Sequence, residues 1–271
     1  MFAACAHRAE RAPAPTPIKS TPLSSILTDL AENTARIETL EARNVRMIIQ
    51  APGLEAKQVM PLSTLYYVQP DRLHLIGRKF GGKQYARVTV AEGSFLLDLP
   101  VEHEFYYRGP GQSFAASAPE ATPADVVAEL FALENWTQLD PRSIVVEEQD
   151  ATLRLTFPAG LGQTKSGGGM ALERSIEVIK VQGRWVLRSS ELRSKGAIIV
   201  SSVFGAHREQ DGIICPMELA VEFPQEQAFM KFFLGSVSFN TPIDQQLFNL
   251  TAQLDRLRRQ NHVERDPYDG S

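Results

Sequence analysis

Apolar and polar residues alternate through much of this chain at the period of two that β-strands require. Between residues 59 and 108, short runs rich in β-branched and aromatic residues are separated by clusters typical of turns, such as Phe80-Gly81-Gly82-Lys83. No connection there is long enough for the crossover between parallel strands, so the pattern predicts an antiparallel meander. The predicted strands are residues 59–68, 72–78, 85–91, 95–99 and 104–108.

Further strands are predicted on both sides of this meander, among them residues 43–51, 172–181 and 229–239. Several runs, including 59–68 and 229–234, carry apolar residues on both faces. A flat sheet with one solvated face does not need that pattern, whereas a curved sheet with an apolar concave face covered by helices does. We therefore expect a mainly β, α+β fold of about eleven antiparallel strands with two or three helices.

Three segments have helical patterns. Residues 22–42 place Leu23, Ile26, Leu27 and Leu30 on one face, with Pro22 suited to the first helical position. This helix either packs in the ordinary way against the sheet or forms one wall of a cavity. Residues 123–135 and 241–250 start with similar Thr-Pro signals. We expect the polar residues 251–271 to form a frayed tail.

The first 22 residues do not have the composition of a folded domain. Phe2-Ala3-Ala4-Cys5 is similar to the lipobox of bacterial lipoproteins, and residues 11–22 are a proline-rich stretch suited to an extended tether. A signal peptide needs a basic region and an apolar run before the cysteine, so we expect such a segment upstream of Met1 in the full gene product. The hypothesis is lipidation of Cys5 with an outer-membrane destination; the alternative is an unmodified cysteine in a flexible terminus.

The composition and charge of the chain limit the kinds of partner that we expect it to bind. The 271 residues are 43% hydrophobic and 22% charged, with a net charge of −4, which is ordinary for a globular protein. Charges of both signs are interspersed, so the clustered basic face of a nucleic-acid-binding protein is not expected. No apolar run approaches the length of a transmembrane helix. Cys215, before Pro216, is interpreted as a small buried apolar residue.

The sequence offers no convincing catalytic, cofactor or metal site. The glycine-rich segment 160–169 fails the phosphate-loop pattern, because Lys165 follows Thr164 rather than glycine. In Glu102-His103-Glu104 the two carboxylates share one face of a strand and the histidine takes the other. His74 and His207 are isolated. We therefore expect a protein that is not an enzyme and needs no cofactor.

The order of elements resembles the LolA/LolB-like lipoprotein carriers and receptors of the bacterial envelope. The resemblance rests on residues 41–51 after an amphipathic helix, then on Gln69-Pro70-Asp71-Arg72-Leu73-His74-Leu75 and a glycine-containing hairpin. Near the end, residues 216–219 and 229–232 are similar to the closing strands of the family. The resemblance spans residues 23–250, which we take as one domain. It implies an open half-barrel, with helices as a lid over a cavity that holds acyl chains.

The predicted function is thus a periplasmic lipoprotein, anchored at the outer membrane, that binds acyl chains of a lipoprotein or lipid. The alternative is a structural or sensory envelope lipoprotein with a filled core and a protein partner. We expect a monomer. Phe80 falls where the receptor branch carries a protruding apolar residue, which implies a contact with membrane or client. The candidate cavity residues are Val45, Met47, Leu65, Leu73, Leu75, Val88, Leu97, Leu155, Ile176, Ile198 and Leu219.

Overall fold

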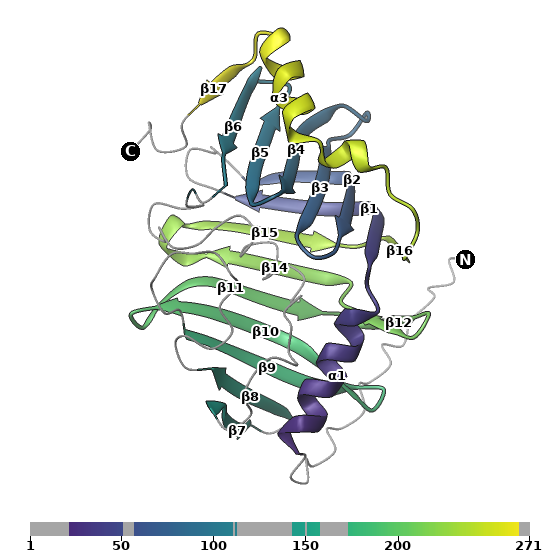
Figure 1. The fold of residues 1–271 in the computed structure, drawn as a ribbon, viewed down its shortest axis with the longest axis vertical. Coiled ribbons are helices and arrows are strands. Elements are labelled where there is room, and N and C mark those ends of the chain that lie inside the picture. The colour runs from purple at the N-terminus through teal and green to yellow at the C-terminus, as the bar shows by residue number, and fades with distance from the viewer. Residues whose placement is uncertain are drawn as a thin grey trace, which may run out of the picture.

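The structure is a computed structural model that describes residues 22–50, 57–110, 112, 143–149, 151–157 and 173–265. These residues form one large curved sheet with two α-helices (Figure 1). The first strands are β1 (Thr39–Gln50), β2 (Gln58–Val68), β3 (Arg72–Arg78), β4 (Gln84–Ala91), β5 (Ser94–Leu99) and β6 (Glu104–Arg108). The predicted meander is confirmed, and β3 and β6 have the predicted bounds.

The second half of the sheet comes from later in the chain. Its strands are β7 (Val145–Gln149), β8 (Thr152–Phe157), β9 (Glu173–Val181), β10 (Arg184–Ser194), β11 (Ala197–Gly205), β14 (Glu218–Phe223), β15 (Ala228–Phe233), β16 (Ser236–Phe239) and β17 (Val263–Arg265). The order is β17-β6-β5-β4-β3-β2-β1-β15-β14-β11-β10-β9-β8-β7, with β16 also on β1. The described sheet therefore has fifteen strands, more than the expected eleven or so, and β1 joins its two halves.

The first helix is shorter than expected. α1 (Leu23–Ala35) ends seven residues before residue 42, and β1 begins at Thr39. Leu40 and Ala42 are both buried, which is the strand period rather than the helical one. Asn44 then adopts a left-handed conformation (φ 54°), and the register with β2 shifts between Ala42 and Val45. The strand signal of these residues therefore overrides the helical pattern that precedes them.

The predicted strand 229–239 is two strands. β15 pairs with residues 46–50 of β1, whereas β16 pairs with residues 40–43 of the same strand. Gly235 lies between them, against the Asn44 bulge of β1. A Cβ atom at Gly235 would lie 2.7 Å from the backbone oxygen of Asn44, so the close approach requires glycine. The bulge and the glycine together divide one apolar run into two pairings.

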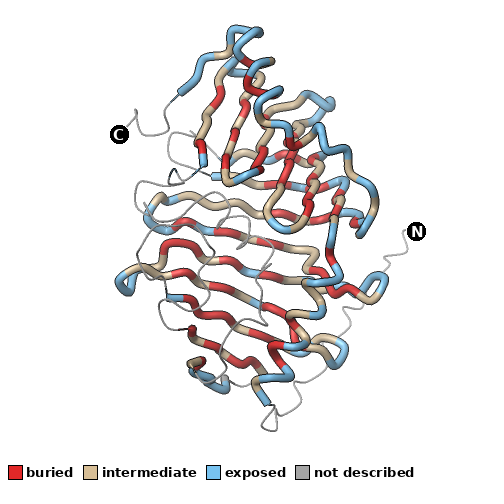
Figure 2. Tube along the Cα trace, in the orientation of Figure 1, coloured by how far each residue is buried: buried red, intermediate tan, exposed pale blue. Residues whose placement is uncertain are grey.

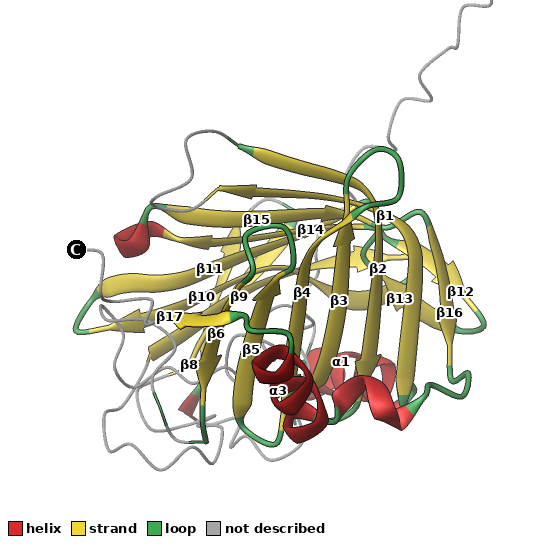
Figure 3. Ribbon diagram, turned by 90° about the horizontal axis from the view of Figure 1, so that it is seen from above, coloured by secondary structure: helices red, strands yellow, loops and turns green. Residues whose placement is uncertain are grey.

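The two helices cover opposite faces of the sheet. α1 buries Ile26, Leu27 and Leu30 in the main core, which lies on the concave face (Figures 1 and 2). α3 (Leu250–Arg259), drawn beside β4 and β5 in Figure 3, instead packs Leu254 and Leu257 against Leu96 of β5 and Phe105 of β6, outside the main core. The prediction that the helices form a common lid is therefore wrong for α3. The side chains that alternate to the other face of β3–β6 form a second, smaller apolar surface, which α3 covers.

The C-terminal residues 251–265 are also ordered, which corrects the predicted frayed tail. Asn249 accepts a hydrogen bond from the backbone N–H of Ala252 and so caps α3, and the short η4 (Gln245–Phe248) precedes it. β17 then adds to the edge of β6 in a parallel pairing. Three residues of this polar segment, Gln253, Leu254 and Leu257, are buried and form one side of the helix.

Some predictions fall outside the described residues. These are the tether with Cys5, the helix at 123–135 and the glycine-rich loop at 160–169. Another element that was not predicted is a hairpin of β12 (Arg208–Gln210) and β13 (Ile213–Cys215), which forms a separate two-stranded sheet. Its apolar run of Ile213, Ile214 and Cys215 is too short to be recognised as a strand from pattern alone.

Candidate functional site

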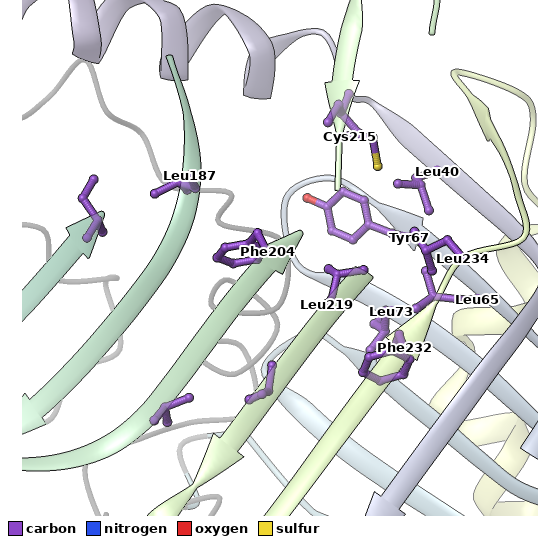
Figure 4. Packing of buried hydrophobic residues seen from close by; sticks show 14 of the residues in the cluster. Leu40, Leu65, Tyr67, Leu73, Leu187, Phe204, Cys215, Leu219, Phe232 and Leu234 are labelled. Carbon is purple, nitrogen blue, oxygen red and sulfur yellow. The ribbon is translucent and has the colours of Figure 1, made fainter. Parts of the chain in front are cut away.

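A small apolar cavity lies between α1 and the concave face of the sheet. Its volume is about 60 Å³, and it is partly enclosed. Figure 4 shows Leu187, Phe204, Leu219, Leu234 and Tyr67 around this region, with Cys215 above them and α1 nearby. The wall is made by Leu30, Asn33, Thr34, Ile37, Leu40, Tyr67, Trp185, Val186, Leu187, Phe204, His207, Ile214, Cys215, Pro216, Leu219 and Leu234. Apolar side chains from six strands and a helix thus meet at one point.

Side chain–backbone hydrogen bonds hold α1 over this cavity. Asn33 donates from Nδ2 to the backbone oxygen of Ile214 (2.9 Å) and accepts at Oδ1 from the N–H of the same residue (2.8 Å). One turn earlier, Asp29 accepts the backbone N–H of Trp185 at 2.9 Å. Arg36, just after the helix, donates to the backbone oxygen of Gly212 at 3.1 Å. The helix is therefore fastened to both β10 and the β12–β13 hairpin.

The β12–β13 hairpin is itself fixed to the large sheet. Arg184 at the start of β10 donates to the backbone oxygen of Gly212 at 2.8 Å. Gln210 donates to the backbone oxygen of Val237 in β16 at 3.1 Å. Ile213 and Cys215 are buried in the main core. The hairpin therefore closes the cavity on the side that α1 leaves open.

The titratable groups in the wall are held neutral by burial. Burial raises the pKa of the Cys215 thiol to about 12, so this cysteine is not a nucleophile at neutral pH. Burial lowers the pKa of His207, whose Nε2 lies 2.9 Å from the backbone oxygen of Leu187. Within the described ranges, no three His, Cys, Asp or Glu side chains are grouped so as to bind a metal ion. The arrangement is suited to holding an apolar group rather than to acid–base chemistry.

The predicted cavity residues lie mostly in the main core and not in the wall of this cavity. Leu219 is the member of the set that also lines it. Val88 and Leu97 are half-buried against the main core, and Ile198 is half-buried at the start of β11. The others are fully buried core residues, namely Val45, Met47, Leu65, Leu73, Leu75, Leu155 and Ile176. Whether any of them contacts a ligand stays a prediction.

The cavity is smaller than the sequence led us to expect. Pockets for small molecules usually measure about 300–1,000 Å³, whereas one water needs about 10–15 Å³. At about 60 Å³, the space would hold a few waters or a short piece of chain. Large side chains, including Tyr67, Trp185 and Phe157, fill the interior that we expected to be hollow. Periodicity identifies the inward positions but does not give the volume that their side chains leave.

Phe80 stands at the tip of the β3–β4 hairpin and is 85% exposed. Gly81 and Gly82 follow it with positive φ angles of 84° and 78°, which L-residues rarely adopt. Lys79 stiffens the base of the turn, because its ammonium group lies 3.6 Å from the centroid of the Tyr85 ring and 2.8 Å from Oε1 of Gln58. An apolar ring is therefore presented to solvent on a short, braced turn.

Comparisons with known proteins show which solved structures share this fold. No family model and no curated relative matches the chain. Several solved structures resemble it, and the three described next are each covered almost completely. They are a DUF1329 family protein from Desulfovibrio piger (TM-score 0.56, 12% identity, 86% of this chain and 99% of that chain), a LolA superfamily protein from Nitrosomonas europaea (0.53, 11%, 85% and 98%) and an outer-membrane lipoprotein-sorting protein domain from Vibrio parahaemolyticus (0.52, 14%, 84% and 98%). The fold is LolA/LolB-like.

On this LolA/LolB-like fold, sequence reasoning missed the residues that fasten the helix. Asn33 carries no signal, because an asparagine in a helix usually faces solvent. Trp185 was not recognised as part of a cavity wall. A helix long enough to cross a membrane does not occur in the parts of the chain that the structure describes. Pairing between residues 181 positions apart, as in Asn33 and Ile214, depends on tertiary structure and leaves no local pattern.

Proposed function

We propose that this protein binds fatty acyl chains of a lipoprotein or lipid between α1 and the concave face of the sheet, without catalysing a reaction. The observation that carries the proposal is the apolar cavity at that place, closed by one amphipathic helix and one short hairpin. Each methylene group moved from water into such a site contributes about 0.8 kcal/mol. The LolA superfamily protein and the lipoprotein-sorting domain with the same fold support this proposal.

Acyl binding requires α1 to move, because the space below it is about 60 Å³. The contacts that hold the helix suit such a movement. Three buried apolar side chains and a few hydrogen bonds fix it, whereas the strands below are joined by continuous ladders. Elements with few buried contacts open at lower free energy than the rest of a fold. We therefore propose that a ligand displaces α1 and occupies the space that Ile26, Leu27 and Leu30 leave.

The proposed location is the periplasmic face of the outer membrane, with Cys5 as a lipidated anchor. The lipobox-like residues before Cys5 and the proline-rich stretch after it support this proposal. Expression of the full gene with its upstream codons, followed by cell fractionation, provides the test. Cys5→Ser should move the protein from the membrane fraction to the soluble fraction. A variant that stays with the membrane as fully as the parent protein would contradict the anchor.

Phe80 is proposed as the contact with the membrane or with the client. Its exposure, the glycines beside it and the nearby cations Arg78, Lys79 and Lys83 support that role. A basic side chain near an anionic membrane contributes about 1 kcal/mol.

The filled interior of the protein favours a second possible function. If the core stays filled, the protein would be a structural or sensory envelope lipoprotein that binds a protein partner. Titration with a fluorescent fatty acid separates the two proposals. The wild-type protein should bind it, and Phe204→Trp, which adds bulk in the cavity wall, should bind it more weakly, as should the smaller change Leu219→Phe. Val203→Trp is the matched control, because Val203 precedes Phe204 in β11 and its side chain is exposed, outside the cavity wall. No binding by the wild-type protein would favour the second function.

A further inference from the structure

One residue of the cavity wall has a buried polar atom without a partner among the described residues. The side chain of Trp185 is 1% exposed, and its indole nitrogen, Nε1, makes no hydrogen bond among the residues that the structure describes. Trp185 belongs to the cavity wall. A buried N–H group without a partner is costly, so buried tryptophans usually find an acceptor. Among the described residues, the cavity wall therefore contains a buried side-chain hydrogen-bond donor that is not used.

The other polar side chains of the wall are already occupied. Both ends of the Asn33 amide bond to Ile214, and the Thr34 hydroxyl donates to the backbone oxygen of Leu30 at 3.0 Å. The Tyr67 hydroxyl donates to the backbone oxygen of Pro70 at 3.0 Å. His207 has the backbone oxygen of Leu187 as its partner. Among the described side chains that the sheet and the β12–β13 hairpin contribute to the wall, Trp185 is therefore the one with a free donor, and it stays in the wall when α1 is displaced.

The indole nitrogen can only donate, which fixes the chemistry of its partner. The ligand must bring an acceptor, and an acyl chain carries one at its end, the carbonyl oxygen. We propose that the Trp185 N–H binds the carbonyl oxygen of an acyl group, so that the site selects a fatty acid or fatty ester over a plain hydrocarbon chain. This inference rests on the proposed function, and it names the polar end of the ligand and the residue that receives it.

The same carbonyl oxygen occurs in a free fatty acid and in the ester of a lipid. Asp29 lies close, since its carboxylate accepts the backbone N–H of Trp185, and Lys180 lies with its ammonium group 5.1 Å from the centroid of the indole ring. Charges of both signs are therefore present, and the test must compare the two sources directly. Decanoate, methyl decanoate and decane have similar chains and differ in the group at the end.

The test is a competition experiment with these three ligands, each delivered from methyl-β-cyclodextrin against a bound fluorescent acyl probe. Trp185→Phe keeps an aromatic ring but removes the donor. We expect this variant to lose about fivefold to tenfold in the preference for methyl decanoate over decane, the effect of one hydrogen bond. An equal loss in the preference for decanoate over decane would show that both the free acid and the ester bind the Trp185 donor. A loss for only one of the two ligands would identify which of them binds it. An unchanged preference for both over decane would overturn the inference.

A spectroscopic measurement on the unmodified protein guards against a variant that folds poorly. The chain has two tryptophans, so a ¹⁵N-indole spectrum should contain two N–H signals. Trp136→Phe leaves the Trp185 signal and so assigns it. That signal should move downfield with methyl decanoate but not with decane, and an identical response to both ligands would contradict the proposed bond. If the wild-type protein binds neither the probe nor any of the three ligands, the proposed function fails and this inference with it. Binding without selectivity would overturn this inference alone.

Discussion

The side chain of Asn33 in α1 forms two hydrogen bonds with the backbone of one residue, Ile214 in β13. Ile214 is 2% exposed, so its N–H and C=O groups have little access to water. The asparagine amide completes the outer edge of the short hairpin in the way that another strand would. This pairing links the helix to the hairpin across the cavity.

Asn33→Ala should therefore destabilise the protein and loosen α1. Loss of the amide leaves the N–H and C=O groups of Ile214 unpaired, and an unpaired buried group costs about 1–3 kcal/mol. Chemical denaturation should show this loss in the free energy of unfolding. Glu32→Ala, at the preceding exposed position of the same helix, is the control and should change it by less than about 0.5 kcal/mol. Equal stability of the two variants would show that the pairing contributes nothing.

Gly235→Ala should be poorly tolerated. The added Cβ would lie 2.7 Å from the backbone oxygen of Asn44 and 2.9 Å from that of Arg43, and backbone atoms cannot rotate away as a side chain can. Backbone shifts of this kind cost about 1–3 kcal/mol. At Gly205 the nearest atom is Cβ of Glu218 at 3.8 Å, so Gly205→Ala should be close to neutral. Thermal unfolding of both variants decides; a stable Gly235→Ala protein would contradict the close approach of β15–β16 to β1.

His74 should make stability depend on pH between about 4 and 6.5. Burial, and then the charge of Arg87, lower its pKa to about 4, while Nδ1 lies 2.9 Å from the Thr89 hydroxyl. Because the unfolded chain binds the proton more readily, stability is complete above pH 6.5 and falls as the pH is lowered toward 4. The loss from this residue alone is about 3 kcal/mol at most.

The measurement compares the free energy of unfolding of the wild-type protein and His74→Gln at several pH values. The glutamine variant cannot titrate, so its stability should fall less steeply over this interval than that of the wild-type protein. Parallel pH profiles would contradict the assignment. The comparison cancels contributions from other groups, including His207 and Asp98, whose pKa values burial also shifts.

Phe80→Glu should weaken binding to anionic liposomes without changing stability. The ring is 85% exposed, so its removal costs the folded state little, while a carboxylate at the tip opposes both insertion and an anionic surface. Val203→Glu, at a half-exposed valine of β11, is the control and should bind liposomes as the wild-type protein does. A large loss of stability with unchanged liposome binding would show instead that Phe80 is a packing residue.

A structural feature can be predicted from the sequence when the residues that determine it lie close together in the chain. The strands around Leu73 and Leu97 follow from alternation, because a strand exposes its period within a few residues. The division of 229–239 at Gly235 follows from the bulge at Asn44, which is nearly two hundred positions away in the chain. The position of α3 on the outer face could not be predicted either, since Leu254 and Leu257 would fit either face of the sheet.

Prediction of the candidate site from the sequence was limited in the same way to features that local patterns determine. The inward positions, such as Leu219, were predictable from their pattern, and most of the predicted set is buried on the concave side. The volume of the cavity was not, because it depends on how Tyr67, Phe204 and Trp185 pack against one another. Asn33 was missed because its partner, Ile214, lies 181 positions away, and the β12–β13 hairpin was missed because its strands are too short to show a pattern.

The measurement that tests the central claim most directly is native mass spectrometry of the protein purified from bacterial envelopes, compared with Phe204→Trp purified in the same way. The account predicts that part of the wild-type protein carries a bound molecule with the mass of a fatty acid, a lipid or an acylated peptide. It predicts that this species is reduced in Phe204→Trp but not in the control Val203→Trp. Wild-type protein that carries no acyl-containing molecule, and gains none when incubated with envelope lipids, would contradict the account.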